Sequence, residues 1–436
     1  MRKVFACGCH WDNNIFYDDL FYKYKRMFLG VGKDGKAINK TLNKMNKIKI
    51  GDLIAIKKRQ EIIALGEVNS AIEKFKQWKD YVGENESNKY RFSLEAEIHT
   101  VGVKEWIKLD IPINYPIMGS HFIHDEYKKL CNEAYKKGIY KMKQEEIINI
   151  LKNKKQIILQ GAPGTGKTYL SPYLAVKLID ENAPSDRAEL MKRYKELVDK
   201  EQIFFTTFHQ SMDYEEFVEG IKPKTENGNI TYELEDGIFK KACKTAESKS
   251  NKVVLIIDEI NRGNISKIFG ELITLLETDK RKGKENEIEA ILPYSKEKFS
   301  VPDNLYIIGT MNTADRSIGY VDYALRRRFA FITIRAEEDK IKNYYDNKDY
   351  DCGEKAKILF GKIAKLIKEN INEEFDADDI MVGHSYFMAQ NLEELQNKLE
   401  YEIKPLLLEY LKDGILKLND ETKDKVNKLN INNLEL

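Results

Sequence analysis

The segment Gly161–Thr168 has residue types and a spacing that suit the binding of phosphate groups. Its glycines let the backbone turn N–H groups towards an anion, and the helix that follows adds a favourable dipole. Lys167 is long enough to reach the β- and γ-phosphates of a nucleotide, and the Thr168 hydroxyl is a ligand type that suits Mg²⁺. A Gly-rich turn without a ligand is the alternative. The nucleotide-binding residues predicted here are Gly161, Ala162, Pro163, Gly164, Thr165, Gly166, Lys167 and Thr168.

A second group of candidate catalytic residues follows about 90 residues later, where the apolar run Val253–Ile257 is followed by Asp258 and Glu259. We predict that Asp258 helps to hold Mg²⁺ together with Thr168, and that Glu259 polarises the attacking water as a general base. Carboxylates at a strand end are often no more than solvated caps. The assignment therefore depends on the phosphate-binding segment that precedes it.

Polar residues also follow a third apolar run, Leu305–Gly309. Asn312 is the candidate for a residue beside the γ-phosphate that positions water, although Asn312 and Asp315 would equally suit an Asx turn. The run Arg326–Arg328 either complements the C-terminal dipole of a short helix or supplies arginine fingers to the nucleotide of a neighbouring subunit. The second interpretation requires a ring of subunits.

These positions need elements that bring them together. Three uninterrupted apolar runs, near residues 157–160, 253–257 and 305–309, alternate with helical patterns. This alternation is typical of an α/β fold with a parallel sheet covered by helices on both faces. Beyond residue 337 the strand signals fade, and apolar residues recur at helical spacing over 354–372 and 392–412. We therefore predict an α/β nucleotide-binding domain over 141–336 and a small helical domain over 337–436.

The first 140 residues differ from the rest because aromatic residues and short β-type runs predominate. Residues 1–135 hold 23 Lys+Arg against 18 Asp+Glu, whereas the whole chain holds 72 against 71. This balance excludes a basic coat over the whole protein and leaves a mildly basic front domain over 1–140. A charged helix is predicted over 124–152. The predicted strands are Lys3–Cys7, Leu53–Lys58, Ile62–Ser70, Phe92–Val101 and Ile107–Ile111.

Cysteine usage and hydropathy limit the cellular setting. The five scattered cysteines argue against a disulfide framework and for a reducing compartment. No apolar run approaches the roughly 20 residues of a membrane span, and the first residues lack the pattern of a signal peptide. We expect a cytoplasmic protein that does not contact a membrane. The cluster of Cys7, Cys9 and His10 has no second ligand pair, which disfavours zinc.

Together, the segments 161–168, 206–223, 255–277, 309–331 and 383–387 resemble those of the AAA+ superfamily. More narrowly, they are similar to McrB-like GTPase subunits of modification-dependent (McrBC, type IV) restriction systems, which serve antiviral defence. The resemblance implies an AAA+ core with a helical lid, hydrolysis of a nucleoside triphosphate with Mg²⁺, and a hexameric ring. The implied catalytic residues are Lys167, Glu259, Asn312, Arg327 and Arg328, with Arg262 as a further contact in trans and Asp322 orienting one arginine.

The same resemblance implies GTP as the substrate, a McrC-like nuclease subunit as the partner and modified DNA as the target. The chain has no Asn-Lys-x-Asp motif to read guanine, so ATP stays open as the substrate. A nucleic-acid sensing switch with ATPase activity and a protein-remodelling AAA+ ATPase are the alternative functions. The role of His384 is open between a lid contact and a packed core residue.

The front domain departs from McrB-like proteins whose first domain binds methylated cytosine. Its segments 48–57 and 64–68 resemble the small β-barrel of EVE, YTH and PUA-like domains, which hold a modified base among aromatic rings. The alternative is that each tryptophan fills the core of the domain. The candidates for reading a modified base are Trp11, Trp78 and Trp106, with Asn13 and Tyr17 as polar or stacking partners.

Overall fold

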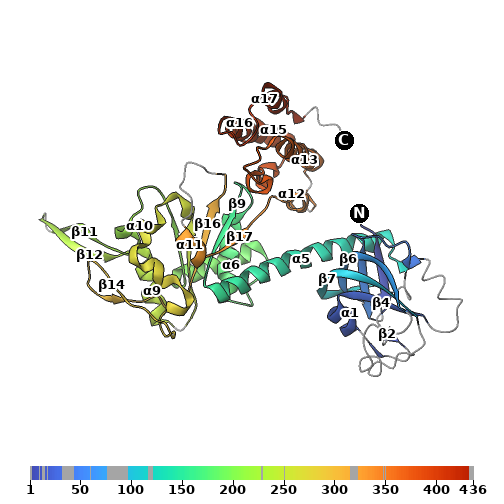
Figure 1. The fold of residues 1–436 in the computed structure, drawn as a ribbon, viewed down its shortest axis with the longest axis horizontal. Coiled ribbons are helices and arrows are strands. Elements are labelled where there is room, and N and C mark those ends of the chain that lie inside the picture. Colours follow the sequence, from blue (N-terminus) through green and yellow to red (C-terminus); the bar gives the residue numbers. More distant parts are fainter. Residues whose placement is uncertain are drawn as a thin grey trace. The chain divides into compact units, whose positions relative to one another are not determined.

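The computed structural model divides the chain into two compact units, Met1–Glu145 and Glu146–Leu436 (Figure 1). Helix α5 (Asp125–Lys154) begins in the first unit and ends in the second. The structure describes residues 2–431 except for 9, 12–14, 17, 32–43, 59, 76–96, 116–120, 227–228, 250, 315–322, 347 and 349.

The first unit is built on a mixed sheet with the strand order β4-β7-β6-β5-β1-β8. Strands β1 and β5 are parallel, and the other neighbouring pairs are antiparallel. The elements are β1 (Val4–Gly8), β2 (His10–Trp11), β3 (Ile15–Phe16), α1 (Asp18–Tyr24), β4 (Arg26–Val31), β5 (Leu53–Lys58), β6 (Glu61–Phe75), β7 (Glu97–Asn114) and β8 (His121–Phe122).

Both faces of this sheet are covered, which explains why β5 is an almost continuous apolar run. Ile54 belongs to a buried cluster that includes Phe21 of α1. Its neighbour Leu53 belongs to a second cluster that includes Cys131 and Tyr135 of α5. Successive side chains of a strand point to opposite faces, so each helix covers one face of the sheet.

The described part of the strand predicted at Phe92–Val101 and the strand predicted at Ile107–Ile111 belong to one long strand, β7, whereas residues 92–96 lie outside the described residues. The register between β6 and β7 shifts between Val68 and Ile72, so the ladder continues through an irregularity instead of ending there. A Cβ at Gly102 would lie 2.5 Å from the Asn69 Oδ1 atom, which is closer than atoms can approach. Gly102 therefore marks a close approach of two strands, although the sequence alone indicates a break.

The second unit contains a parallel five-stranded sheet with the order β10-β13-β16-β9-β17. These strands are β9 (Gln156–Gly161), β10 (Ile203–Thr207), β13 (Val253–Asp258), β16 (Leu305–Asn312) and β17 (Ala330–Thr333). Ile256 and Ile257 of β13 lie in different buried clusters, so hydrophobic residues pack on both faces. The predicted α/β fold with a parallel sheet is confirmed.

Helices and small strands complete this α/β part. Figure 1 shows the hairpin of β11 and β12 projecting from it. The helical elements are α6 (Lys167–Ile179), α7 (Arg187–Asp199), α8 (Tyr214–Phe217), α9 (Ile238–Ser248), η1 (Ile260–Arg262), α10 (Ile265–Phe269), η2 (Gly270–Leu276), η3 (Thr278–Lys280) and α11 (Tyr323–Arg328). The small strands are β11 (Glu219–Glu226), β12 (Asn229–Asp236), β14 (Ala290–Ile291) and β15 (Lys298–Phe299).

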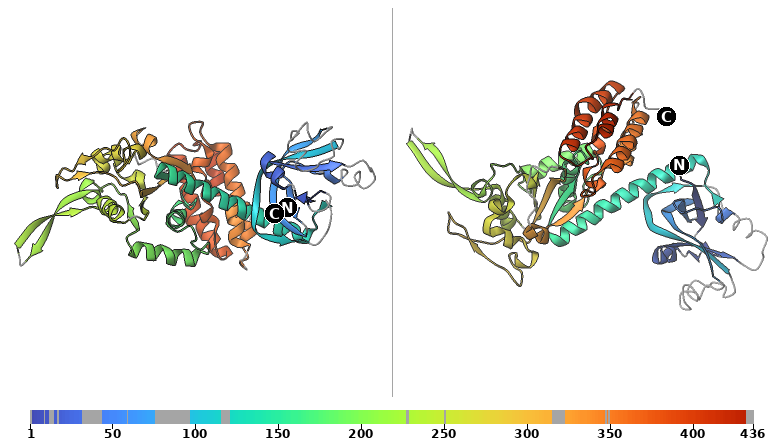
Figure 2. Two further views of the ribbon diagram at one scale, coloured as in Figure 1. Left: turned by 90° about the horizontal axis from the view of Figure 1, so that it is seen from below. Right: turned by 45° about the horizontal axis from the view of Figure 1, so that its top comes forward.

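Residues beyond 337 form a helical bundle, drawn in orange to dark red in Figure 2, with its own buried apolar cluster. Its elements are α12 (Glu338–Tyr345), α13 (Gly353–Asn370), α14 (Ala377–Ile380), η4 (His384–Phe387), α15 (Leu392–Lys398), η5 (Leu399–Ile403), α16 (Lys404–Lys412) and α17 (Asp420–Asn427). We call this bundle the lid. Among the described residues, no helix combines the length and the apolar character that a bilayer crossing requires.

Candidate functional site

The predicted phosphate-binding segment lies between the end of β9 and the start of α6. Gly161 and Gly164 have φ angles of +150° and +75°, which favour glycine. A Cβ at Gly161 would lie 2.3 Å from the Ile334 carbonyl oxygen, and a Cβ at Gly164 would lie 2.7 Å from the Ser385 Oγ atom. Only glycine fits these positions, because the loop packs tightly against Ile334, which follows β17, and against the lid.

The Lys167 side chain is buried within this loop. Its ammonium group donates hydrogen bonds to the carbonyl oxygens of Gly161 and Ala162, both at 2.8 Å. Burial lowers the pKa of Lys167 to about 8, although the charges of Glu259 and Asp258 act in the opposite direction. The group is thus held at the loop by neutral acceptors, and a phosphate would offer it a charged one.

The end of β13 places Asp258 beside the loop. The Thr168 hydroxyl donates to the Asp258 Oδ1 atom at 3.0 Å, and the Thr310 hydroxyl donates to the same oxygen at 2.5 Å. The hydroxyl of Thr168 and the carboxylate of Asp258 are hard oxygen donors, so the pair fits Mg²⁺ completed by phosphates and water. The described residues hold no cluster of three or more His, Cys, Asp or Glu side chains for a metal.

Sequence reasoning missed Thr310, because its role depends on the register between β13 and β16. Ile257 of β13 pairs with Gly309 of β16, so the residues that follow each of them are neighbours at the carboxyl edge of the sheet. The Thr310 Oγ1 atom also accepts a hydrogen bond from the Glu259 backbone N–H at 3.1 Å. Thr310 therefore fixes both acidic residues at the strand end.

Glu259 and Asn312 meet across the ends of β13 and β16. The Asn312 side-chain amide donates to the Glu259 Oε1 atom at 2.6 Å, and Arg262 lies 3.4 Å from the other carboxylate oxygen. Glu259 has a φ angle of +52°, an uncommon conformation for a residue with a side chain. Its carboxylate is thus placed by a strained backbone and by two polar neighbours.

The predicted arginine fingers lie at the end of α11, and their side chains differ in exposure to solvent. The Arg327 side chain is 69% exposed, whereas the Arg328 side chain is 8% exposed. Both guanidinium groups contact the carboxylate of Glu277. A guanidinium that is buried in its own chain is badly placed to reach a neighbouring subunit, so the difference in exposure favours Arg327 over Arg328. Asp315 and Asp322 lie outside the described residues.

The lid contacts the phosphate-binding loop through the segment that contains His384. The Gly383 N–H donates to the Pro163 carbonyl oxygen and the Ser385 N–H donates to the Gly164 carbonyl oxygen, both at 3.1 Å. His384 is buried, and burial lowers its pKa to about 4, helped by the charge of Lys340. Within the described part of the chain, the buried His384 Nδ1 atom has no hydrogen-bond partner.

Of the candidate reader residues in the first unit, only Trp106 has a side chain that the structure describes. Trp11 lies on β2, and its side chain is outside the description, as are Asn13, Tyr17 and Trp78. Trp106 is buried in the core against Phe21 and Tyr22, with ring centroids 6.1 and 6.3 Å away. For Trp106 the structure therefore favours the core interpretation.

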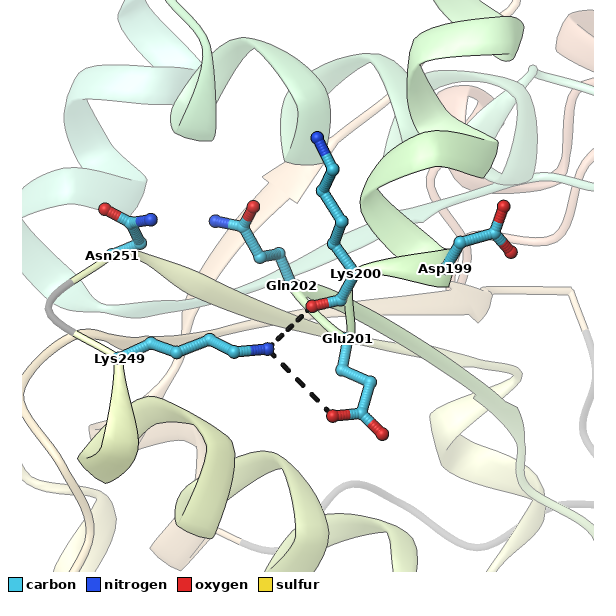
Figure 3. A pocket seen from close by; sticks show the side chains of 6 residues that line it. All are labelled: Asp199, Lys200, Glu201, Gln202, Lys249 and Asn251. Carbon is cyan, nitrogen blue, oxygen red and sulfur yellow. Dashed lines mark hydrogen bonds and ion pairs between the residues drawn. The ribbon is translucent and has the colours of Figure 1, made fainter.

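A pocket of about 600 Å³ lies elsewhere in the second unit, at the amino ends of β10 and β13 (Figure 3). Its wall includes Lys249, whose ammonium group donates to the Lys200 carbonyl oxygen at 2.7 Å and lies 3.9 Å from Glu201. The phosphate-binding loop and both acidic residues lie at the opposite, carboxyl ends of the strands. This pocket is therefore separate from the candidate site.

Family comparisons match residues 185–329 to an AAA domain of the dynein-related subfamily and residues 361–419 to the alpha-helical lid domain of McrB. Residues 141–212 match the family Novel STAND NTPase 3. Among solved structures, a candidate ATPase from Cytophaga hutchinsonii matches with 11% identity and a TM-score of 0.25, over 69% of this chain and 98% of that chain. A TM-score at this level supports no conclusion.

Two characterised proteins are similar in sequence. The Type IV methyl-directed restriction enzyme EcoKMcrB subunit of Escherichia coli (strain K12) is 39% identical over 288 residues, which cover 62% of this chain and 56% of that protein. The Type II restriction enzyme BsuMI component YdiS of Bacillus subtilis (strain 168) is 26% identical over 293 residues, which cover 60% of this chain and 79% of that protein. The chain thus spans little more than half the length of its Escherichia coli relative.

These matches and the geometry agree. The parallel sheet carries a phosphate-binding loop, two acidic residues and an asparagine at its carboxyl edge, and a helical lid contacts that loop. The lid family match falls on the same helices. The second unit of the chain therefore resembles an AAA domain followed by a McrB-type helical lid.

Proposed function

We propose that this chain is the nucleoside-triphosphate-hydrolysing motor and DNA-recognition subunit of a McrBC-like restriction complex. The observation that carries the proposal is the hydrogen bond between Asn312 and Glu259 beside the phosphate-binding loop. A general base must be oriented to act, and this pair places a carboxylate next to Lys167, Thr168 and Asp258. An intact set of this kind favours turnover over a nucleotide site that only binds.

In the proposed reaction, the loop N–H groups and Lys167 hold the nucleotide phosphates. Mg²⁺, held by Thr168 and Asp258 when bound, neutralises phosphate charge. Glu259 accepts a proton from the water whose oxygen bonds to the γ-phosphorus, while the bond from that phosphorus to the β–γ bridging oxygen breaks. Arg327 of a neighbouring subunit stabilises the charge that develops on the γ-phosphoryl group, which requires a ring that we propose to be hexameric.

We propose GTP as the substrate because the second unit is McrB-like, and ATP is the alternative because the sequence carries no guanine-reading motif. A nuclease subunit similar to McrC is the proposed partner, since one similar protein is described as a subunit and another as a component of restriction enzymes. The proposed chain has three domains. The first, over residues 1–140, has an EVE- or PUA-like fold and reads the modified base. The second, over 141–336, hydrolyses the nucleotide, and the third, over 337–436, is the lid.

The proposal is tested by measuring hydrolysis of GTP and of ATP by the purified chain, with and without DNA carrying a modified base. We expect GTP to be hydrolysed faster, and we expect modified DNA together with the nuclease partner to raise the rate. Equal rates with both nucleotides would remove the GTP assignment and leave the motor assignment standing. A chain that hydrolyses neither nucleotide, alone or with the partner and DNA, would overturn the proposed function.

A further inference from the structure

Glu277 contacts three cationic side chains. It follows η2, and its side chain is 18% exposed. Arg327 and Arg328 approach its Oε1 atom at 2.5 and 2.9 Å, and the Lys280 ammonium lies 2.7 Å from its Oε2 atom. Burial alone would raise the pKa of Glu277, but hydrogen bonds from Lys280 and Arg327 outweigh it and lower the pKa. The carboxylate is thus kept ionised.

The two arginines bound by Glu277 have different surroundings. Arg328 is buried, so its charge is neutralised inside the protein by the carboxylate. Arg327 points into solvent, and an exposed ion pair of this kind adds little to stability. A guanidinium carries five N–H donors in a rigid fork, so one contact with Glu277 leaves donors for a second anion. The ion pair therefore orients Arg327 and leaves N–H donors of its guanidinium for a second anion.

The backbone on both sides of this ion pair is fixed by a buried network. The side-chain amide of Gln156 donates to the carbonyl oxygens of Leu276 and Arg328, at 2.7 and 2.8 Å. The fully buried Arg281 donates in turn to the Gln156 Oε1 atom at 2.7 Å. Gln156 begins β9, the strand that ends at the phosphate-binding loop. Glu277 and α11 are therefore anchored to one rigid strand.

Arg281 shows how firmly this network is built. Its guanidinium also donates to the carbonyl oxygens of Pro302 and Leu305, at 3.1 and 2.5 Å. Burial lowers its pKa to about 10, so the group still carries its charge near neutral pH. A buried charge satisfied mostly by carbonyl groups is costly to maintain. The Arg281 Nε atom also donates to the Leu276 carbonyl oxygen at 3.4 Å, so this buried group helps to immobilise the segment that leads into Glu277.

We propose that Glu277 is a positioning residue that orients Arg327 towards the nucleotide of a neighbouring subunit. This inference rests on the proposed function, in which Arg327 acts in trans. Sequence reasoning placed this orienting role on Asp322 and gave Glu277 none. Glu277 acts through Arg327 and touches no reacting atom. Its loss therefore lowers kcat and leaves the binding of nucleotide to the same subunit unchanged.

The test compares Glu277→Gln with the matched control Glu271→Gln. Glu271 lies on η2 and accepts a hydrogen bond from the Tyr214 hydroxyl at 2.8 Å, away from the arginines. We expect Glu277→Gln to lower kcat by about 10- to 100-fold with KM changed less than twofold, because a misplaced group costs rate. Glu277→Asp keeps the charge and should recover part of the loss. Glu271→Gln should keep the wild-type kcat.

A mixing experiment separates positioning from a general defect in folding. Subunits with Glu277→Gln keep an intact nucleotide site, and subunits with Glu259→Gln keep an intact Arg327. In mixed rings, some interfaces join the two intact halves, so the mixture should hydrolyse several-fold faster than either variant alone. Mixtures no faster than the variants, or a Glu277→Gln variant with wild-type kcat, would overturn the inference. A wild-type chain without hydrolysis would overturn the proposed function itself.

Discussion

The two units of this chain use their distinctive side chains in opposite ways. In the second unit, polar residues predicted from sequence meet at the carboxyl edge of a parallel sheet, where Asn312 contacts Glu259 and Thr168 contacts Asp258. In the first unit, the candidate that the structure does describe, Trp106, packs inside the core. A parallel sheet brings the ends of its strands together, so strand order alone predicts neighbours. A mixed sheet has no such common edge.

Replacing Glu259 with Gln should give the largest effect on the second unit. The amide cannot accept the proton of the attacking water, so kcat should fall by up to about 10⁴-fold, or about 5 kcal/mol of transition-state stabilisation. The amide keeps the shape of the carboxylate, so nucleotide binding and thermal unfolding should change little. Steady-state hydrolysis and fluorescent-nucleotide titration measure the two quantities. Turnover that survives this change would show that the edge of the sheet holds no general base.

The contrast between the parallel sheet of the second unit and the mixed sheet of the first also explains how far the sequence predicts the structure. The run Leu53–Lys58 is β5 with the predicted bounds, and Val253–Ile257 lies within β13, because both strands are buried on both faces. The break predicted before Ile107 is absent, because the long β6–β7 ladder accommodates its irregularities as register shifts. Local patterns identify buried strands well, but they do not show where a ladder continues through a bulge.

The sequence analysis predicted that Thr168 and Asp258 hold Mg²⁺ together, but it did not predict the contact between Asn312 and Glu259. Asn312 ends β16 and Glu259 directly follows the neighbouring parallel strand β13, so their approach follows from the topology. Glu277 contacts Arg327, fifty residues later, across a short 3₁₀ segment and a short helix that carry no periodic signal. The burial of Arg328 was equally hidden, because three consecutive arginines look alike in sequence. Tertiary packing alone distinguishes them.

Replacing Trp106 with Ala should give the next largest effect, confined to the first unit. Removing a buried indole leaves a cavity, so the free energy of unfolding should fall by at least about 3 kcal/mol. Trp106→Phe should cost much less, because the indole N–H is buried and has no hydrogen-bond partner among the described residues. Hydrogen exchange in β6 and β7 measures the loss. Basal nucleotide hydrolysis should stay within twofold of the wild-type rate.

These variants also test the core interpretation of Trp106. If Trp106→Phe left hydrogen exchange unchanged but abolished binding of DNA with a modified base, Trp106 would contact the base and the contrast between the units would weaken. Phe21, which stacks on Trp106 in the same cluster, offers a matched control. Phe21→Leu should destabilise the unit in the same way as a change at Trp106.

The smallest predicted effect is a pH dependence of stability that comes from His384 in the lid. Burial holds its folded-state pKa at about 4, below the ordinary 6.5, so the unfolded chain binds more protons between these values. Stability is therefore complete above pH 6.5 and falls as the pH drops towards 4. Between pH 7.5 and pH 5 the loss from this group should be about 2 kcal/mol. Urea unfolding at both pH values measures it, and His384→Gln, which cannot titrate, should remove that part of the slope. An unchanged slope in the variant would show that burial does not hold His384 neutral in the folded protein.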